Sequence, residues 1–361
     1  MSVLRSFAAA DHAKRDLDVT VGSKPESHPG FFPVTVVILT IILFLVLSQL
    51  ISYVYGHVVG TLAAVEDPNP DIYVRIDEPV TQPHSEPDVT LPRPITSSFR
   101  RAVAHLRSRA GRRARFRGLG LYLLMQFAVG VLASPIARLF GDGFGAHAVG
   151  RFAAQVALTN VRVGWVHVII SEPSSKSLWS RIPPWRKTIR RAGPAAAIRS
   201  LASQLFLFIT LTVANASNVI DGIFHSDKLN TGQVVRGSVG TLIVSMILYV
   251  LIRLPAEVIF IRVAASMLPE DDEAIVPFDR TFGGKVTPEI VGGQGKIGIV
   301  EAWQSFDRGS RIRFLKLMAE MVLVQCIVTV MLGVVLAVEA SMFFGFLFLP
   351  RRPNFIRYPC L

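Results

Sequence analysis

Residues 253–262 read Arg-Leu-Pro-Ala-Glu-Val-Ile-Phe-Ile-Arg and lie within an apolar run that extends from about residue 237 to 268. Such a run predicts one tilted membrane-spanning helix, because about 20 apolar residues are enough to cross a bilayer. Each charged side chain on that helix costs roughly 2.5–3.5 kcal/mol if it faces lipid. We therefore expect the two arginines and the glutamate of this segment to face protein, water or one another. The proline donates no backbone hydrogen bond and predicts a kink.

This kinked and charged helix end has two interpretations. One is a solute pathway or gate inside a membrane protein. The other is that Arg253 and Arg262 snorkel to the interface while Glu257 neutralises one of them.

The overall composition indicates an integral membrane protein. Of the 361 residues, 51% are hydrophobic, and the mean hydropathy is +0.45, which is more apolar than a soluble domain of this length needs to be. The net charge of +12 comes from basic residues that lie between the apolar runs, so anionic lipid is the expected partner and nucleic acid is not. The eight histidines lack paired metal spacing and the two cysteines imply no disulfide framework, so we expect no metal and no cofactor. The small-residue cluster at 237–240 is interpreted as helix packing, and we expect no enzyme activity.

The apolar runs predict six membrane spans between a polar N-terminal tail and a basic C-terminal tail. The tails cover residues 1–32 and 351–361, and the spans cover about 33–64, 118–140, 148–171, 195–219, 237–268 and 314–349. The third span is the most polar, because Arg162 and His167 lie along it. A helix with such residues is expected to line an interior cavity.

Basic residues gather in three long loops and are scarce in the short connections between spans. The first basic stretch, 95–117, has the spacing of an amphipathic helix that lies on a membrane face, and the second, around 172–194, carries Trp179 and Trp185. We expect all three long loops to share one side of the membrane.

Several motifs of this chain resemble those of the mitochondrial carrier family. The segment Pro255-Ala-Glu257-Val-Ile-Phe-Ile-Arg262 matches the family's proline, acid and final base, and departs from it at Phe260. The segment Gly111-Arg-Arg-Ala-Arg-Phe-Arg117-Gly118 matches the second half-motif without its acid, and 298–305 is a weaker copy. The resemblance covers about residues 33–350. In the second repeat, Arg162 occupies the acid place, so the family's ring of salt bridges is not complete.

The resemblance implies an all-α membrane protein with six transmembrane helices in three helix-loop-helix repeats around a pseudo-threefold axis. The repeats would cover residues 33–140, 141–219 and 236–350. It also implies a mitochondrial membrane as the location.

The function implied is transport of a small charged metabolite by alternating access. Substrate would be bound by Arg162, His167, Arg253 and Glu257, and the gate would be formed by Pro255, Glu257 and Arg262. The alternative is a transport-inactive, carrier-derived membrane adaptor or scaffold that binds other proteins. Anionic lipid, such as cardiolipin, is expected at Gly111, Arg117, Gly118, Trp179 and Trp185.

A specific contact is also predicted. Arg162 and Glu257 carry opposite charges on two different spans, and each would be costly alone at that depth. We expect them to pair, with Arg253 as the competing partner of Glu257 one turn earlier on the same helix.

Overall fold

The computed structural model describes residues 31–67, 94–220, 231–287, 292–293 and 295–348, and in this part the chain is helical, without a strand. The all-α prediction is therefore confirmed for the described residues. The helices are α2 (Phe31–Ser52), α3 (Gly60–Val65), α4 (Phe99–Ala110), α5 (Leu119–Arg138), α6 (Phe144–Ala157), α7 (Thr159–Ile170), α8 (Trp185–Ala216), α10 (Thr231–Leu248), α11 (Leu254–Ala265), α12 (Ile299–Gln304) and α13 (Arg308–Phe348). The two predicted tails lie outside the described residues.

Five helices of the described part are long and apolar enough to cross a membrane. They cover Val34–Val65, Ala114–Arg138, Trp185–Ala216, Gly232–Ala265 and Arg308–Met342. A sixth span would consist of α6 and α7 together, which are bent by 59° at Leu158. At this bend the Thr159 hydroxyl donates to the Val156 carbonyl at 2.5 Å, a side-chain contact that competes with regular helical bonding. These helices agree with an integral membrane protein.

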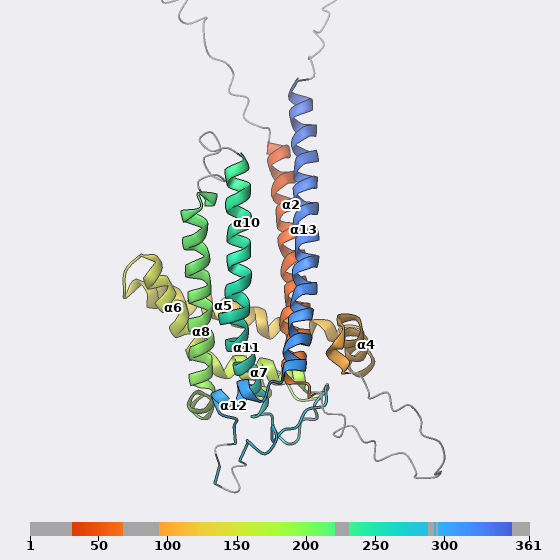
Figure 1. The fold of residues 1–361 in the computed structure, drawn as a ribbon, viewed down its shortest axis with the longest axis vertical. Coiled ribbons are helices and arrows are strands. Elements are labelled where there is room, and N and C mark those ends of the chain that lie inside the picture. Colours follow the sequence, from red (N-terminus) through yellow and green to blue (C-terminus); the bar gives the residue numbers. More distant parts are fainter. Residues whose placement is uncertain (1–30, 68–93, 221–230, 288–291, 294, 349–361) are drawn as a thin grey trace, which may run out of the picture. The chain divides into compact units, whose positions relative to one another are not determined.

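The chain forms two compact units, and the three predicted repeats are not seen. Among the described residues, one unit comprises 31–49 and 325–348, and the other comprises those between 50 and 324. The boundaries fall inside the first and last predicted spans. In the first unit, α2 and α13 lie side by side (Figure 1), and polar contacts join them. The Thr40 hydroxyl donates to Glu339 at 2.5 Å, and the Gln325 amide donates to the Ser48 hydroxyl.

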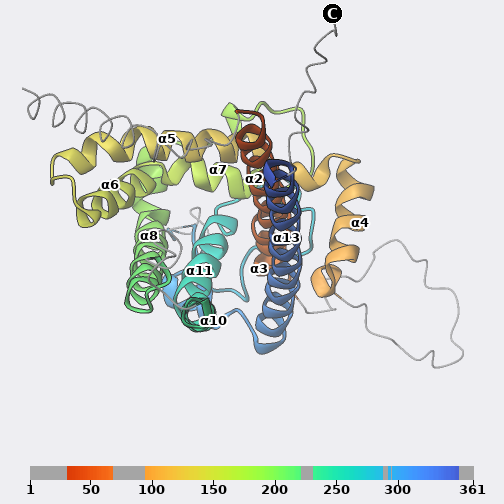
Figure 2. The same cartoon turned by 90° about the horizontal axis from the view of Figure 1, so that it is seen from above.

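Within the second unit, α5 forms as predicted but runs across α8 and α10. Figure 1 shows α8 and α10 upright with α5 and α7 crossing them, and Figure 2 shows α5 and α7 at full length while α10 is seen nearly end-on. Hence α5 does not stand parallel to the other spans, as the helix-loop-helix repeats imply. It is paired instead with α6, and the close approach depends on Gly150, where an added Cβ would lie 2.3 Å from the Ala133 carbonyl oxygen.

The irregularity predicted at Pro255 takes the form of a π-helical turn, Tyr249–Arg253, between α10 and α11. Proline lacks the N–H that would bond four residues back, and a wider turn just before it leaves room for that loss. The chain still continues as one long helix from Gly232 to Ala265.

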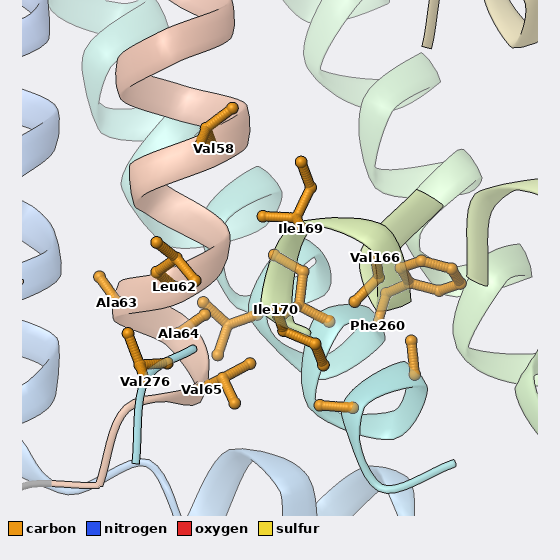
Figure 3. Packing of buried hydrophobic residues seen from close by; sticks show 14 of the residues in the cluster. Val58, Leu62, Ala63, Ala64, Val65, Val166, Ile169, Ile170, Phe260 and Val276 are labelled. Atoms are coloured by element: carbon orange, nitrogen blue, oxygen red, sulfur yellow. The ribbon is translucent and has the colours of Figure 1, made fainter. Parts of the chain in front are cut away.

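The core of the second unit is centred on α7, whose residues 162–170 are all buried. Figure 3 shows Val166, Ile169 and Ile170 of α7 directed toward Leu62 of α3 and Phe260 of α11. A helix that is apolar around most of its circumference is typical of a position enclosed on all sides. This helix holds Arg162 in the interior.

Helix α13 begins with a side-chain cap in the loop before it. The Asp307 carboxylate accepts hydrogen bonds from the N–H groups of Gly309 at 3.0 Å and Ser310 at 3.1 Å. Burial raises the pKa of Asp307, but these bonds, together with the Ser310 hydroxyl and nearby Arg313, outweigh burial and hold the pKa below its ordinary value. The negative charge therefore stabilises the start of α13.

Candidate functional site

Three helices of the second unit bring three charged side chains together. Arg162 comes from α7, Arg199 from α8 and Glu257 from α11. The surface of α8 near Arg199 is built from buried small residues, including Ala195, Ala196 and Ser200. Small side chains let helices approach closely, so the arginine of α8 reaches the carboxylate of α11.

Glu257 is shared by the two arginines. Arg162 Nη2 lies 2.7 Å from Glu257 Oε1, and Arg199 Nη1 lies 3.3 Å from Glu257 Oε2. Both carboxylate oxygens are thus occupied by guanidiniums from other helices. The predicted pair of Arg162 with Glu257 is confirmed, while its role in binding stays a prediction.

Phe260 lies one helical turn after Glu257 and contacts both arginines through its ring. The guanidinium carbon lies 5.8 Å from the ring centroid for Arg162 and 5.5 Å for Arg199. Arg162 also lies 5.7 Å from the Trp165 ring. Cations over aromatic faces are attracted by the ring quadrupole, so Phe260, the departure from the resembled motif, stabilises positive charge here.

The cluster carries more positive charge than negative. Two guanidiniums face one carboxylate, and the exposed fractions of the side chains are 7% for Arg162, 10% for Arg199 and 22% for Glu257. The Nε atoms of both arginines are buried and have no hydrogen-bond partner among the described residues. Buried N–H groups are nearly always satisfied, so the site has donors in reserve for an anionic group.

His57 and Tyr122 lie next to this cluster. Tyr122 Oη is 3.1 Å from His57 Nε2, and the His57 ring meets the edge of Trp165 at 5.9 Å. His57 lies within the electrostatic reach of Arg162, Arg199 and Glu257. These two side chains place further hydrogen-bonding groups beside the cluster.

Two of the predicted substrate residues make their contacts with other groups, although Arg253 still lies within the electrostatic reach of Arg199. Arg253 lies 5.4 Å over the Phe206 ring, and the carboxylate of Glu257 is taken by other helices, so the within-helix pair is not the one formed. His167 Nε2 lies 2.9 Å from the Ala264 carbonyl in the core. His167 follows Arg162 by five positions, and this spacing places them on different faces of α7.

Arg262, a predicted gate residue, donates hydrogen bonds to two other segments of the second unit. It donates to the Ala64 carbonyl at 2.9 Å and to the Ser305 hydroxyl at 3.0 Å, and it lies 4.6 Å over the Phe282 ring. These contacts tie α11 to the ends of α3 and α12. Its hydrogen bonds satisfy the ends of these helices, and the role of Arg262 in a gate stays a prediction.

Only two of the five predicted lipid residues line a common cavity. Arg117 and Gly118 line a basic cavity, whereas Gly111, Trp179 and Trp185 are not among its lining residues. The Trp179 and Trp185 side chains are exposed, and the Trp185 indole donates to the Ala157 carbonyl at 2.8 Å. Trp185 therefore fastens the start of α8 to the end of α6.

Sequence reasoning missed Arg199, although a signal for it was present. It lies a few residues inside the predicted span 195–219 and meets the criterion applied to Arg162, a charge within an apolar run. Within the described residues, no group of three His, Cys, Asp or Glu side chains could hold a metal ion.

Comparison with known proteins adds no relative. No family model, no curated protein and no solved structure matches the chain, so the resemblance to the mitochondrial carrier family rests on the quoted motifs alone.

Proposed function

We propose that this chain is a membrane transporter of a small anionic solute, which is bound by Arg162, Arg199 and Glu257. The observation that carries the proposal is the pair of buried arginines that share one carboxylate. A positive excess inside a membrane protein is costly unless a counter-charge completes it. A solute carboxylate or phosphate is that counter-charge. The mitochondrial location is proposed on the motif resemblance alone.

The contacts suggest how binding is coupled to movement. Without solute, the Arg162–Glu257 pair links α7 to α11 and the Arg199–Glu257 pair links α8 to α11. An anion that accepts hydrogen bonds from the two free Nε groups competes with Glu257 for the same guanidiniums. It thereby weakens the links between the helices, and differential binding of this kind can shift a membrane protein between two conformations.

The test begins with binding by the purified full chain in neutral detergent. Sodium succinate and sodium phosphate are compared with sodium chloride at equal ionic strength, so that screening is the same in every sample. A ligand at a hundred times its Kd stabilises the folded state by about 2.7 kcal/mol, which is readily seen as a rise in Tm. We expect at least one of the two anions to stabilise the wild type beyond chloride.

Arg199→Met decides whether the cluster is responsible. This variant keeps the Arg162–Glu257 pair, which is neutral as a whole, and removes the positive excess, so it should fold and lose the stabilisation by anions. Arg151→Met on α6 is the control, because Arg151 is an exposed arginine that does not belong to the cluster. No stabilisation of the wild type, or equal stabilisation of Arg199→Met, would reject the binding site. Binding without uptake of labelled anion into liposomes would reject transport.

The second candidate is the transport-inactive membrane adaptor. The observation in its favour is the use of Arg262 as a structural anchor for α3 and α12, since a base fixed in this way cannot open and close a gate. On this interpretation the two arginines and Glu257 only join three helices. The anion and uptake experiments separate the two candidates, because an adaptor predicts neither anion-specific stabilisation nor uptake.

A further inference from the structure

One charged side chain of the first unit has no counter-charge. Helix α2 carries no charged residue, and from Cys326 to Phe348 helix α13 carries a single one, Glu339. Within the described residues this carboxylate forms no ion pair. One of its oxygens accepts a hydrogen bond from the Thr40 hydroxyl, and the other, Oε2, is buried without a partner. The negative charge of Glu339 is therefore unbalanced in this helix pair.

Glu339 lies deep between the ends of the two helices. The contacts Thr40–Glu339 and Ser48–Gln325 show that the helices are antiparallel, because the residue number falls on α13 as it rises on α2. Thr40 follows the start of α2 by nine residues, and Glu339 precedes the end of α13 by nine. At a rise of about 1.5 Å per residue, the contact lies roughly 13 Å from the end of each helix. In a hydrocarbon core about 30 Å thick, such a depth is close to the middle.

A carboxylate at this depth is expected to pair with a base. Ionisable side chains inside a membrane are costly when they face lipid, and they pair with one another, with backbone carbonyls or with water. A carboxylate accepts hydrogen bonds and cannot donate them, so a backbone carbonyl does not satisfy it. Neither α2 nor the part of α13 beyond Gln325 contains a Lys, Arg or His. The counter-charge would therefore come from outside this helix pair.

The surface beside Glu339 is open to another helix. The Glu339 residue is itself partly exposed. Residues three positions apart are neighbours on a helix surface. Met342, three positions after Glu339, is 69% exposed, and Leu43, three positions after Thr40, is 65% exposed. An apolar helix that carries a base would cover these side chains and bring its charge to the carboxylate.

A second polar contact of the same pair shows how a neutral side chain joins the two helices. Gln325 lies fourteen residues before Glu339, about four helical turns, and hence on the same side of α13. Its amide donates to the Ser48 hydroxyl. The Gln325 carbonyl oxygen is also buried without a partner, but an unpaired neutral acceptor costs far less in a membrane than an unpaired charge. An amide is thus enough to link α2 to α13, and the charge of Glu339 is not needed for that link.

From these observations we infer that the α2–α13 pair binds a transmembrane helix of a partner protein, and that a Lys or Arg of this helix pairs with Glu339 at the depth of Thr40. The partner is defined by its chemistry, an apolar span with one base about nine residues from one end. The inference is independent of the proposed transport function, because it involves neither Arg199 nor Glu257. It applies to a transporter and to an adaptor alike.

The test uses the purified full chain, captured on beads in neutral detergent, and fluorescent synthetic transmembrane peptides built from leucine and alanine. One peptide carries an arginine nine residues from one end, a second carries leucine there, and a third carries glutamate. We expect the wild type to retain the arginine peptide about tenfold better than the leucine peptide, the effect of one polar contact between membrane helices. The glutamate peptide should be retained least, because it meets a like charge.

Glu339→Gln decides whether the carboxylate is responsible. This variant keeps the size of the side chain and, as at Gln325, an amide that donates across the pair. It should fold, with circular dichroism and Tm as checks, and lose the preference for arginine. Glu320→Gln is the matched control, because it removes the other acid of α13, nineteen residues earlier, and should keep the preference.

Equal retention of the arginine and leucine peptides by the wild type would overturn the inference, and so would an unchanged preference in Glu339→Gln. Light scattering on the same samples tests a different occupant. Self-association of the wild type that is lost in Glu339→Gln would assign the surface to a second copy of this chain and overturn the separate partner.

Discussion

The sharpest prediction concerns the coupling between Arg162 and Glu257. The two ion pairs at 2.7 and 3.3 Å correspond to gross attractions of about 6 and 5 kcal/mol at an effective dielectric constant of 20, most of which is offset by desolvation. Glu257→Gln keeps the shape of the side chain and removes its charge. It leaves two buried guanidiniums unpaired, and we expect a loss of about 3–5 kcal/mol in the free energy of unfolding.

The effect of Arg162→Met should be smaller. Glu257 keeps Arg199 in this variant, so no carboxylate is stranded, and the loss should be about 1–2 kcal/mol from the missing hydrogen bond and ring contacts. In the double variant Arg162 is no longer an unpaired buried charge. The two losses should therefore sum to more than the loss measured for the double variant, with a coupling energy of about 1–3 kcal/mol.

The assay is unfolding of the purified chain in mixed micelles by added sodium dodecyl sulfate, followed by circular dichroism, with Tm as a second readout. Arg253→Met supplies the comparison cycle, since Arg253 lies over the Phe206 ring and acts on the cluster without an ion pair, so its coupling to Glu257→Gln should be smaller than that of Arg162. A coupling energy below about 0.5 kcal/mol for Arg162, or a larger one for Arg253, would refute the assigned pair. The charge exchange of Glu257→Arg with Arg162→Glu should rescue stability only in part, because Arg199 would then face a like charge.

Three further predictions follow from other parts of the fold. Gly150→Val should separate α5 from α6 and lower Tm, because a Cβ there would lie 2.3 Å from a backbone oxygen, whereas Gly145→Ala has open space and should leave Tm unchanged or higher; equal shifts would contradict the packing. Asp307→Ala should cost about 1 kcal/mol at neutral pH. Because the folded-state pKa of Asp307 lies below its ordinary value of 3.8, this difference from wild type should be complete above that pH and shrink as pH falls through the folded-state pKa, and a constant difference would exclude the carboxylate as the cause. Single cysteines at Asp142 and at Ser98, on a background without native cysteines, should be labelled from the same side of the membrane if α5 and α6 form a hairpin that does not cross it. Labelling of the two cysteines from opposite sides would show that α5 crosses the membrane.

The helices of this fold were predictable because apolar runs of sufficient length leave few alternatives in a membrane. The predicted span 118–140 became α5, Leu119–Arg138, and 314–349 became part of α13, Arg308–Phe348. Helix α8 begins at Trp185, ten residues before the predicted span, because a helix can continue through basic residues that hydropathy counts as loop. The direction of α5 was not predictable in this way, since hydropathy measures how apolar a helix is and not which helix it packs against.

Of the candidate site, only the pairing of opposite charges inside the membrane was predictable from sequence. A buried charge needs an opposite charge, and this rule found Arg162 and Glu257 from sequence. The same rule applied to α8 would have found Arg199, but the repeat pattern directed attention to other spans. The role given to Arg262 came from the resemblance, and its actual contacts with Ala64 and Ser305 depend on chain segments that no spacing rule brings together.

The two departures from the carrier-like pattern, Phe260 and Arg162, meet at the cluster around Glu257. In that pattern each repeat supplies an acid and a base, so the charges cancel when the ring closes. Here Phe260 stands in place of a base on α11 and Arg162 stands in place of an acid on α7, while α8 adds Arg199. Two guanidiniums, from α7 and α8, face the carboxylate of α11, and the aromatic ring that contacts both lowers the cost of keeping them. Two guanidiniums against one carboxylate leave one positive charge to be balanced, which is why we infer that a solute held at this site is an anion and that a cation is repelled.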